Sequence, residues 1–149
     1  MSVSYVDIDA LYQQSDIISL HCPLVPANKH MINRSSIQQM KEGVVLLNTS
    51  RGALIDTSAV IEALKNRKIG GLAIDVYEQE EKLFFKDLSD TIIEDDTLQR
   101  LMSFPNVLIT AHQAFFTQEA LHQITSTTLK NVEELLAGQE LSNEQARLV

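Results

Sequence analysis

The chain has 149 residues, of which 44% are hydrophobic and 21% charged, a composition typical of a soluble globular domain rather than a disordered or collagen-like chain. The net charge of −8 argues against non-specific binding to nucleic acids or anionic membranes, where positive charge supplies the affinity. No stretch approaches the roughly 18 apolar residues of a membrane span, and no basic segment followed by an apolar run predicts a secretory signal. The single cysteine, Cys22, cannot form a disulfide within the chain and predicts a reducing, cytoplasmic location.

The first predicted elements are two short apolar runs, residues 17–20 and 44–47, with a helix at residues 35–40 between them. A second helix is predicted to begin near Asp56 or Thr57, either of which can cap it. That helix ends in a cluster of cations followed by two glycines, which is a common helix C-terminus.

Two further apolar runs follow at residues 71–76 and 107–110, and a long helix with an apolar stripe is predicted at residues 117–138. Between the two runs, residues 78–104 are less regular and predict a long excursion with one short helix. Residues 78–96 contain eight acidic and two basic side chains, so they carry −6 of the net −8 and are interpreted mostly as solvated surface.

The four apolar runs predict strands of a parallel sheet, because near-continuous Val, Ile and Leu runs are typical of strands buried on both faces. Strands that alternate with helices predict an α/β fold with a doubly wound sheet. Sites in such sheets lie at the carboxyl ends of the strands. A polar cluster follows each predicted strand at that place: residues 21–23, 48–52, 75–80 and 111–113.

Four residues in these clusters are candidates for chemistry. Arg51 has the planar donor fork that clamps a carboxylate, although it also fits a surface salt bridge. His112 can exchange a proton near neutral pH, although a lone histidine is more often structural. Glu80 fits a solvated carboxylate, or the partner of an imidazolium, whose charged form it would favour. Asp75 closes an apolar run, where a carboxylate is costly unless it is paired or contacts a ligand.

Other chemistries have little support in the sequence. There is no spacing of Cys and His residues that predicts a zinc site, so no metal site is predicted. The nucleophile elbow of the α/β-hydrolases is absent. Residues 48–52 could bind phosphate at a helix start, but they do not form a Walker motif.

The motifs LHCP, NTSRGALID, GLAIDVYE and TAHQAF, in this order, resemble the D-isomer-specific 2-hydroxyacid dehydrogenases over residues 5–138. The segments DVYEQEEKLFFKD and HQAFF are most similar to the D-lactate dehydrogenase branch. The resemblance implies that the cofactor is NAD, that the substrate is a small 2-oxo or 2-hydroxy acid such as pyruvate or D-lactate, and that the family protein is a homodimer.

The resemblance also implies a role for each motif residue. Arg51 would bind the substrate carboxylate, and His112 would donate the proton in reduction and accept it in oxidation. Glu80 would keep His112 protonated, although the sequence alone leaves Glu78 and Glu81 as alternatives. Phe115 would border the pocket for the substrate methyl group. The residues implied in NAD binding are Cys22, Pro23, Asn28, Thr49, Ser50, Arg51 and Asp75.

The sequence departs from the family pattern in one large respect. It contains no G-x-G-x-x-G and no acidic residue about 20 positions beyond one to bind the adenine ribose. Residues 1–115 are therefore expected to form the second half of a Rossmann-like NAD-binding domain that lacks its first βαβ unit. Residues 116–149 are expected to form a C-terminal helix and tail that would pack on a missing substrate domain.

Three functional hypotheses follow. The first is the C-terminal part of an NAD-dependent D-lactate dehydrogenase, inactive as an isolated chain. The second is a non-catalytic truncated paralogue that acts as a binding or pairing module. The third is a dehydrogenase for another 2-hydroxy acid, such as glycerate. The choice between NAD and NADP depends on residues that this sequence lacks.

Overall fold

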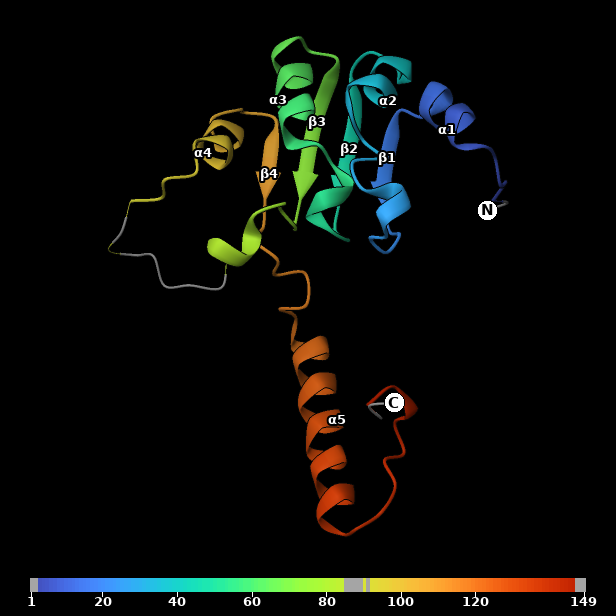
Figure 1. The fold of residues 1–149 in the computed structure, drawn as a ribbon, viewed down its shortest axis with the longest axis vertical. Coiled ribbons are helices and arrows are strands. Elements are labelled where there is room, and N and C mark those ends of the chain that lie inside the picture. The colour runs from blue at the N-terminus through green and yellow to red at the C-terminus, as the bar shows by residue number, and fades with distance from the viewer. Residues whose placement is uncertain (1–2, 85–89, 91, 147–149) are drawn as a thin grey trace. The chain divides into compact units, whose positions relative to one another are not determined.

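The computed structural model describes residues 3–84, 90 and 92–146, which fall into two compact units, Met1–His112 and Gln113–Val149. The first unit contains one sheet of parallel strands in the order β1-β2-β3-β4 (Figure 1). The strands are β1 Ile17–Leu20, β2 Val44–Asn48, β3 Ile69–Ile74 and β4 Val107–Ile109. The predicted α/β fold with a parallel sheet is confirmed.

Helices connect the strands and open and close the chain. The α-helices are α1 Ile8–Gln14, α2 Arg34–Gln39, α3 Thr57–Lys65, α4 Asp96–Met102 and α5 Gln118–Leu136. In the described part of the chain, single 3₁₀ turns accompany them: η1 Pro26–Asn28, η2 Gly52–Leu54, η3 Glu80–Lys82 and η4 Glu144–Ala146. Because every crossover between neighbouring strands contains a helix, the strands can run parallel.

Side-chain caps explain where α2 and α3 begin. The Asn33 side chain accepts hydrogen bonds from the amides of Ser35 and Ser36 at the start of α2. At the start of α3, Asp56 Oδ1 accepts one from the Ala59 amide, at 3.1 Å. Each cap satisfies amides that have no partner inside the helix.

Helix α1 was not predicted from the sequence. Its N-cap residue, Asp7, makes no side-chain hydrogen bond to the helix, and Tyr12 is its one buried residue. A short helix with one buried side chain leaves little periodic signal, and it is stabilised by tertiary packing instead.

Strand β3 begins two residues before the predicted run and ends two residues before its predicted end, so Asp75 follows the strand. The glycines that predicted a turn after α3 lie inside the strand. Gly70 is required by close approach, since a Cβ there would lie 2.5 Å from the carbonyl oxygen of Gly43.

The expectation that the strands are buried on both faces is wrong for this chain. One face contains the aligned residues Ile18, Leu46 and Leu72, all at most 4% exposed. Helices α1 to α4 all contribute side chains to the same core cluster. On the other face, Ile17 is 64% exposed and Leu108 is 61% exposed, so that surface lacks a covering layer within the described residues.

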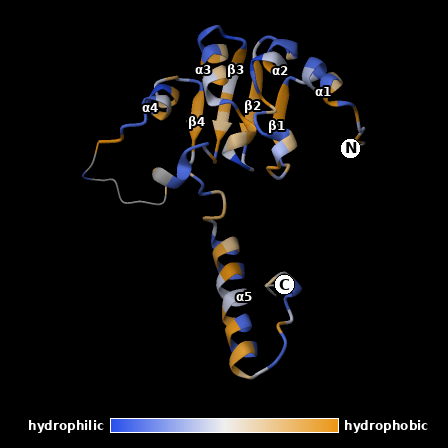
Figure 2. Ribbon diagram, viewed as in Figure 1, coloured by the Kyte–Doolittle hydropathy of each residue, from blue (hydrophilic) through white to orange (hydrophobic). Residues whose placement is uncertain are grey.

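The second unit contains α5, whose first turn is capped by Thr117. None of the described α5 residues is buried, and orange apolar positions recur along the helix in Figure 2. Its exposed large apolar side chains are Leu121, Ile124, Leu129, Val132, Leu135 and Leu136. Although α5 is long, no helix in the described part of the chain has the length and apolar character needed to span a bilayer.

Candidate active site

The predicted polar clusters meet at one edge of the sheet. All four strands are parallel, so their carboxyl ends lie at the same edge, where the arrowheads point in Figure 1. The loops that leave this edge contain every predicted site residue of the first unit.

A buried asparagine shapes the loop that carries Arg51. Asn48 ends β2 with no exposed surface, its Nδ2 donates to the carbonyl of Arg51 at 2.9 Å, and its Oδ1 accepts from the Ser50 amide at 3.1 Å. These bonds fold the backbone into a tight turn and leave the Arg51 side chain exposed. Arg51 Nη1 donates to the Ser50 carbonyl at 2.7 Å, and a guanidinium has four further N–H donors for an anion.

The loop after β1 is tied to this turn. Ser50 Oγ donates to the Cys22 carbonyl at 2.6 Å. Asn28 Nδ2 donates to the Pro23 carbonyl at 2.8 Å, and Asn28 Oδ1 accepts from the Val25 amide at 2.8 Å. The structure therefore brings Cys22, Pro23, Asn28 and Ser50 into one bonded group. Thr49 lies exposed in the same turn.

Asp75 joins the ends of β3 and β4. It is 3% exposed, and its Oδ1 accepts a hydrogen bond from Thr110 Oγ1. Its carbonyl oxygen accepts a bond from the His112 amide, and its own amide donates to the Asn48 carbonyl at 2.9 Å. Asp75 thus connects the turn after β2 with the segment that carries His112.

His112 and Glu80 form a pair across two loops. His112 Nδ1 lies 3.0 Å from Glu80 Oε1, and their side chains are 32% and 16% exposed. The other carboxylate oxygen, Glu80 Oε2, accepts a hydrogen bond from the Tyr77 amide at 2.9 Å. Both oxygens of Glu80 therefore have a partner, and the imidazole ring is oriented by the carboxylate.

The backbone that presents His112 is unusual. Ala111 and His112 have φ angles of 53° and 56°, both in the left-handed region, which costs roughly 1 kcal/mol or more for a residue with a Cβ. Such conformations persist only where the surroundings hold them, and they cluster at functional sites. Here the bond from the His112 amide to Asp75 holds the strained turn.

Of the two alternatives to Glu80, Glu78 has different partners. Its Oε1 lies 2.6 Å from His30 Nε2, and its Oε2 accepts hydrogen bonds from Thr57. Glu81 is exposed in η3. Of the three acidic residues that the sequence left open, Glu80 is the one whose carboxylate pairs with the His112 ring, at 3.0 Å.

Tyr77 connects the loop that contains Glu80 to Asp95 at the start of α4. Its side chain is buried, and its hydroxyl donates to Asp95 Oδ1 and Oδ2 at 3.1 and 3.0 Å. Burial raises the pKa of the Tyr77 phenol well above its ordinary value of 10.0, and the bond to Asp95 and the charge of Glu78 act in the same direction.

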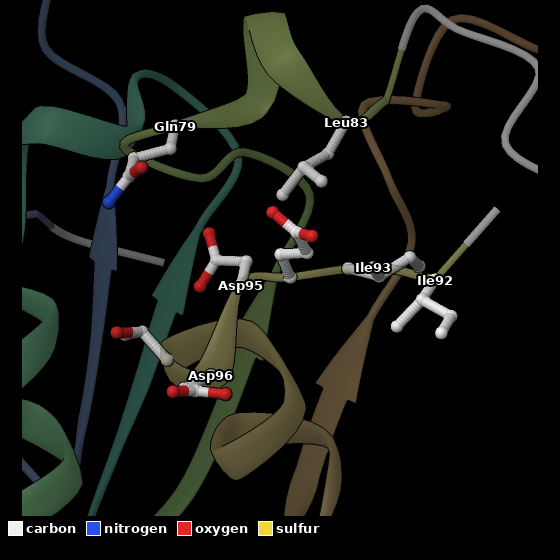
Figure 3. A pocket seen from close by; sticks show the side chains of 8 residues that line it. Gln79, Leu83, Ile92, Ile93, Asp95 and Asp96 are labelled. Carbon is white, nitrogen blue, oxygen red and sulfur yellow. The ribbon is translucent and has the colours of Figure 1, made fainter.

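A pocket of about 530 Å³ lies beside this loop (Figure 3). Leu83, Ile92 and Ile93 contribute apolar side chains to it, and Asp95 and Asp96 contribute carboxylates. None of the predicted site residues lines it. An acidic lining disfavours an anionic substrate, so the pocket is not the candidate active site.

Phe115 belongs to the second unit and is 48% exposed, with its ring edge-on to Phe116 at 6.3 Å between centroids. The motifs do not single out Asn48 or Thr110, although Asn48 bonds to the Arg51 turn and Thr110 donates to Asp75. The position of Asn48, a polar residue directly after the apolar run 44–47, is the sequence feature that could have indicated its role. Among the described residues, no group of three His, Cys, Asp or Glu side chains is placed to hold a metal ion.

Comparison with known proteins matches residues 1–114 to the NAD-binding domain of the D-isomer specific 2-hydroxyacid dehydrogenases. The D-lactate dehydrogenase of Escherichia coli (strain K12) is 55% identical over 144 residues, which are 97% of this chain and 44% of that enzyme. The solved structure of the pyruvate reductase of Chlamydomonas reinhardtii has a TM-score of 0.87 and 45% identity, and covers 93% of this chain and 43% of its own.

A solved D-lactate dehydrogenase of Aquifex aeolicus, complexed with NAD and lactic acid, has a TM-score of 0.80 and 38% identity, over 91% of this chain and 41% of its own. This chain therefore spans less than half the length of these relatives. The resemblance found in the sequence motifs is confirmed. With a parallel sheet, a site at its carboxyl edge and a family match over residues 1–114, the chain belongs to the D-isomer-specific 2-hydroxyacid dehydrogenases and contains sequence of their NAD-binding domain.

Proposed function

We propose that this chain carries the catalytic side chains of an NAD-dependent D-2-hydroxyacid dehydrogenase whose substrate pair is pyruvate and D-lactate. The observation that carries the proposal is the 3.0 Å pair of His112 Nδ1 and Glu80 Oε1 at the sheet edge that also presents Arg51. The names of the relatives described above support the choice of substrate. Because they are more than twice as long, the proposal concerns this chain within a longer protein.

His112 is the proton donor in this proposal. Glu80 contacts Nδ1, so Nε2 is the ring nitrogen that we assign to the substrate carbonyl oxygen. The carboxylate stabilises the imidazolium before reduction, and the ring becomes neutral once the proton has moved. A positioned acid of this kind contributes roughly 10²–10⁴ to the rate.

Arg51 is the substrate clamp. Its exposed guanidinium can bind the carboxylate of a 2-oxo acid through two parallel hydrogen bonds. Because Asn48 and Ser50 hold the turn on both sides, the guanidinium starts from an ordered backbone. An oriented substrate reacts faster, because the translational and rotational entropy needed to align it is lost when it binds and not in the chemical step.

The residues at this edge fit part of an NAD site. Asp75 is a buried carboxylate at this edge, and carboxylate oxygens are acceptors that suit the amide N–H groups of nicotinamide. The bonded group of Cys22, Pro23, Asn28 and Ser50 offers a preformed surface beside it. When bound, NADH supplies the hydride that adds to the substrate carbonyl carbon.

We assign the exposed apolar surfaces to contacts made in the longer protein. The uncovered sheet face and the apolar side of α5 would pack against a substrate domain and, in a homodimer, a second subunit. Exposed apolar surface of this extent marks an interaction site.

The same surface supports the second hypothesis, a pairing module without catalysis. Light scattering on the purified chain tests it, since a pairing module forms a defined oligomer at micromolar concentration.

The activity test has two parts. The isolated chain, mixed with NADH and pyruvate, is expected to give negligible D-lactate, because it has no G-x-G-x-x-G segment for the dinucleotide. A chimera that replaces the matching 144 residues of the Escherichia coli enzyme with this chain is expected to be active. An inactive but folded chimera refutes the proposed function. Glycerate and bulkier 2-oxo acids are tested in parallel. A clear preference for one of them over D-lactate and pyruvate would favour the third hypothesis.

Variants of the chimera test the roles. His112→Ala is expected to lower kcat by roughly 10²–10⁴, whereas His122→Ala, an exposed histidine of α5, serves as the matched control. Arg51→Ala is expected mainly to raise KM for pyruvate, because it removes the donor fork assigned to the substrate carboxylate. Parent kinetics for His112→Ala or Arg51→Ala would contradict the assigned roles.

A further inference from the structure

Glu78 follows β3, two residues before Glu80, and its carboxylate makes three contacts, one with the loop residue His30 and two with Thr57 at the start of α3. Oε1 lies 2.6 Å from His30 Nε2, and Oε2 accepts hydrogen bonds from Thr57 N at 3.0 Å and Thr57 Oγ1 at 2.6 Å. The side chain is 24% exposed. An acidic residue inside a solvated segment would not need partners this close, so Glu78, like Glu80 and Asp95, is held by specific contacts.

Both partners are themselves fixed. Thr57 is buried and is the first residue of α3, where the helix N-terminus favours a negative charge. His30 has a φ of 53°, its amide donates to the Ala53 carbonyl at 2.8 Å, and its carbonyl accepts from Asn33 Nδ2 at 2.8 Å. Glu78 is therefore bonded to two ordered points, one on the segment after β1 and one on the segment after β2.

The Glu78 backbone also touches the turn that carries Arg51. A Cβ added to Gly52, the residue after Arg51, would collide with the backbone of Tyr77 and with the Glu78 amide. On the other side, the Tyr77 amide donates to Glu80 Oε2. The backbone of residues 77–78 is thus packed between the turn of Arg51 and the carboxylate that contacts His112.

We infer that Glu78 is a positioning residue, which sets the placement of the Glu80–His112 pair relative to Arg51 by bonding the loop after β3 to His30 and Thr57. This inference rests on the proposed function, because the groups it positions are those assigned to catalysis. Glu78 itself contacts neither His112 nor Arg51 through any described hydrogen bond, so its effect is transmitted through the backbone of residues 77–80.

The first test uses the chain alone and does not need activity. In a ¹⁵N-labelled sample, Glu78→Ala is expected to shift the Tyr77 amide signal and the His112 ring-nitrogen signals. Glu78→Gln, which keeps an acceptor for Thr57, is expected to shift them less. Glu81→Gln, which removes an exposed charge from the same loop, is the control and is expected to leave them in place.

The positioning role is refuted if Glu78→Ala moves the His30 ring signals while those of Tyr77 and His112 stay unchanged. If Glu78→Ala does not fold, His30→Asn removes the other half of the contact, and asparagine tolerates the left-handed backbone at that position. Its expected shifts at Tyr77 and His112, or their absence, then decide the question.

The second test uses the active chimera. Glu78→Ala is expected to lower kcat by about 10-fold or more, since a misplacement of about 1 Å can cost as much as 10²-fold. KM for NADH is expected to change by less than about threefold, and Glu78→Gln to recover most of kcat. Unchanged kcat in Glu78→Ala refutes the inference. An inactive parent chimera refutes the proposed function, and the chain-alone spectra then still decide whether Glu78 positions the pair.

Discussion

Gly52 at the candidate site packs against the backbone of the loop after β3, and replacing this residue with alanine gives a sharp test. The new Cβ would lie 2.5 Å from the Glu78 amide nitrogen and would collide with the Tyr77 carbonyl group. Ordinary contacts of a Cβ lie near 3.5–4 Å, so one loop must move by about 1 Å. Because the obstacle is backbone rather than a flexible side chain, we expect a loss of about 3 kcal/mol, the upper part of the range for overpacking.

Urea unfolding of the isolated chain measures this loss. With a slope of about 2 kcal/mol per molar urea, the midpoint of Gly52→Ala should fall by roughly 1.5 M. Gly71→Ala is the matched control, because its Cβ would meet both Cγ atoms of Val45 at an ordinary 3.7 Å. That variant should be neutral or slightly stabilised, since glycine costs about 0.5–1 kcal/mol in a strand interior. If Gly52→Ala unfolds within about 0.5 kcal/mol of the parent, the two loops are not in backbone contact.

Three further predictions concern the same edge of the sheet. Ala111→Gly should stabilise the chain by about 0.5–1 kcal/mol in urea unfolding, because glycine adopts the φ of 53° without strain, and a loss of stability would contradict that conformation. Asn48→Ala should cost about 2–4 kcal/mol, because it leaves the Arg51 carbonyl without its buried donor, and unchanged stability would show that water replaces the side chain. Burial and Asp95 raise the pKa of Tyr77 in the folded chain, so the phenol of the unfolded chain ionises first as the pH rises. The contribution of Tyr77 to the free energy of unfolding should therefore be fully present below pH 10 and be lost as the pH rises further. When urea midpoints are measured on both sides of pH 10, the midpoint of Tyr77→Phe should fall less than that of the parent. An equal fall in both would refute the raised pKa of Tyr77.

The motifs predict a site at the carboxyl ends of the strands, because each motif depends only on residues that are close together in the sequence. Each strand end is followed by its polar cluster within a few residues, so the positions of Arg51, Asp75 and His112 at one edge follow from parallel strands alone. Caps such as Asp56 are equally local, and α3 begins where the sequence predicts.

The choice between Glu78 and Glu80 could not be made from local pattern. The two carboxylates are two residues apart in an irregular loop, where no helix or strand period assigns a direction to either side chain. Their partners, His30 and His112, lie 48 and 32 residues away in the sequence. Only the packing of three loops against one another sends one carboxylate to each histidine.

The sequence by itself determined the family, the alternation of strands with helices and the residue types at the sheet edge, because these depend on motifs and on short-range propensity. Tertiary structure alone decided the one-sided burial of the strands, since burial depends on which helices are present to cover each face. It also decided the strained turn at His112 and the bonds of Asn48, because a buried polar group takes whichever partner the fold brings within reach.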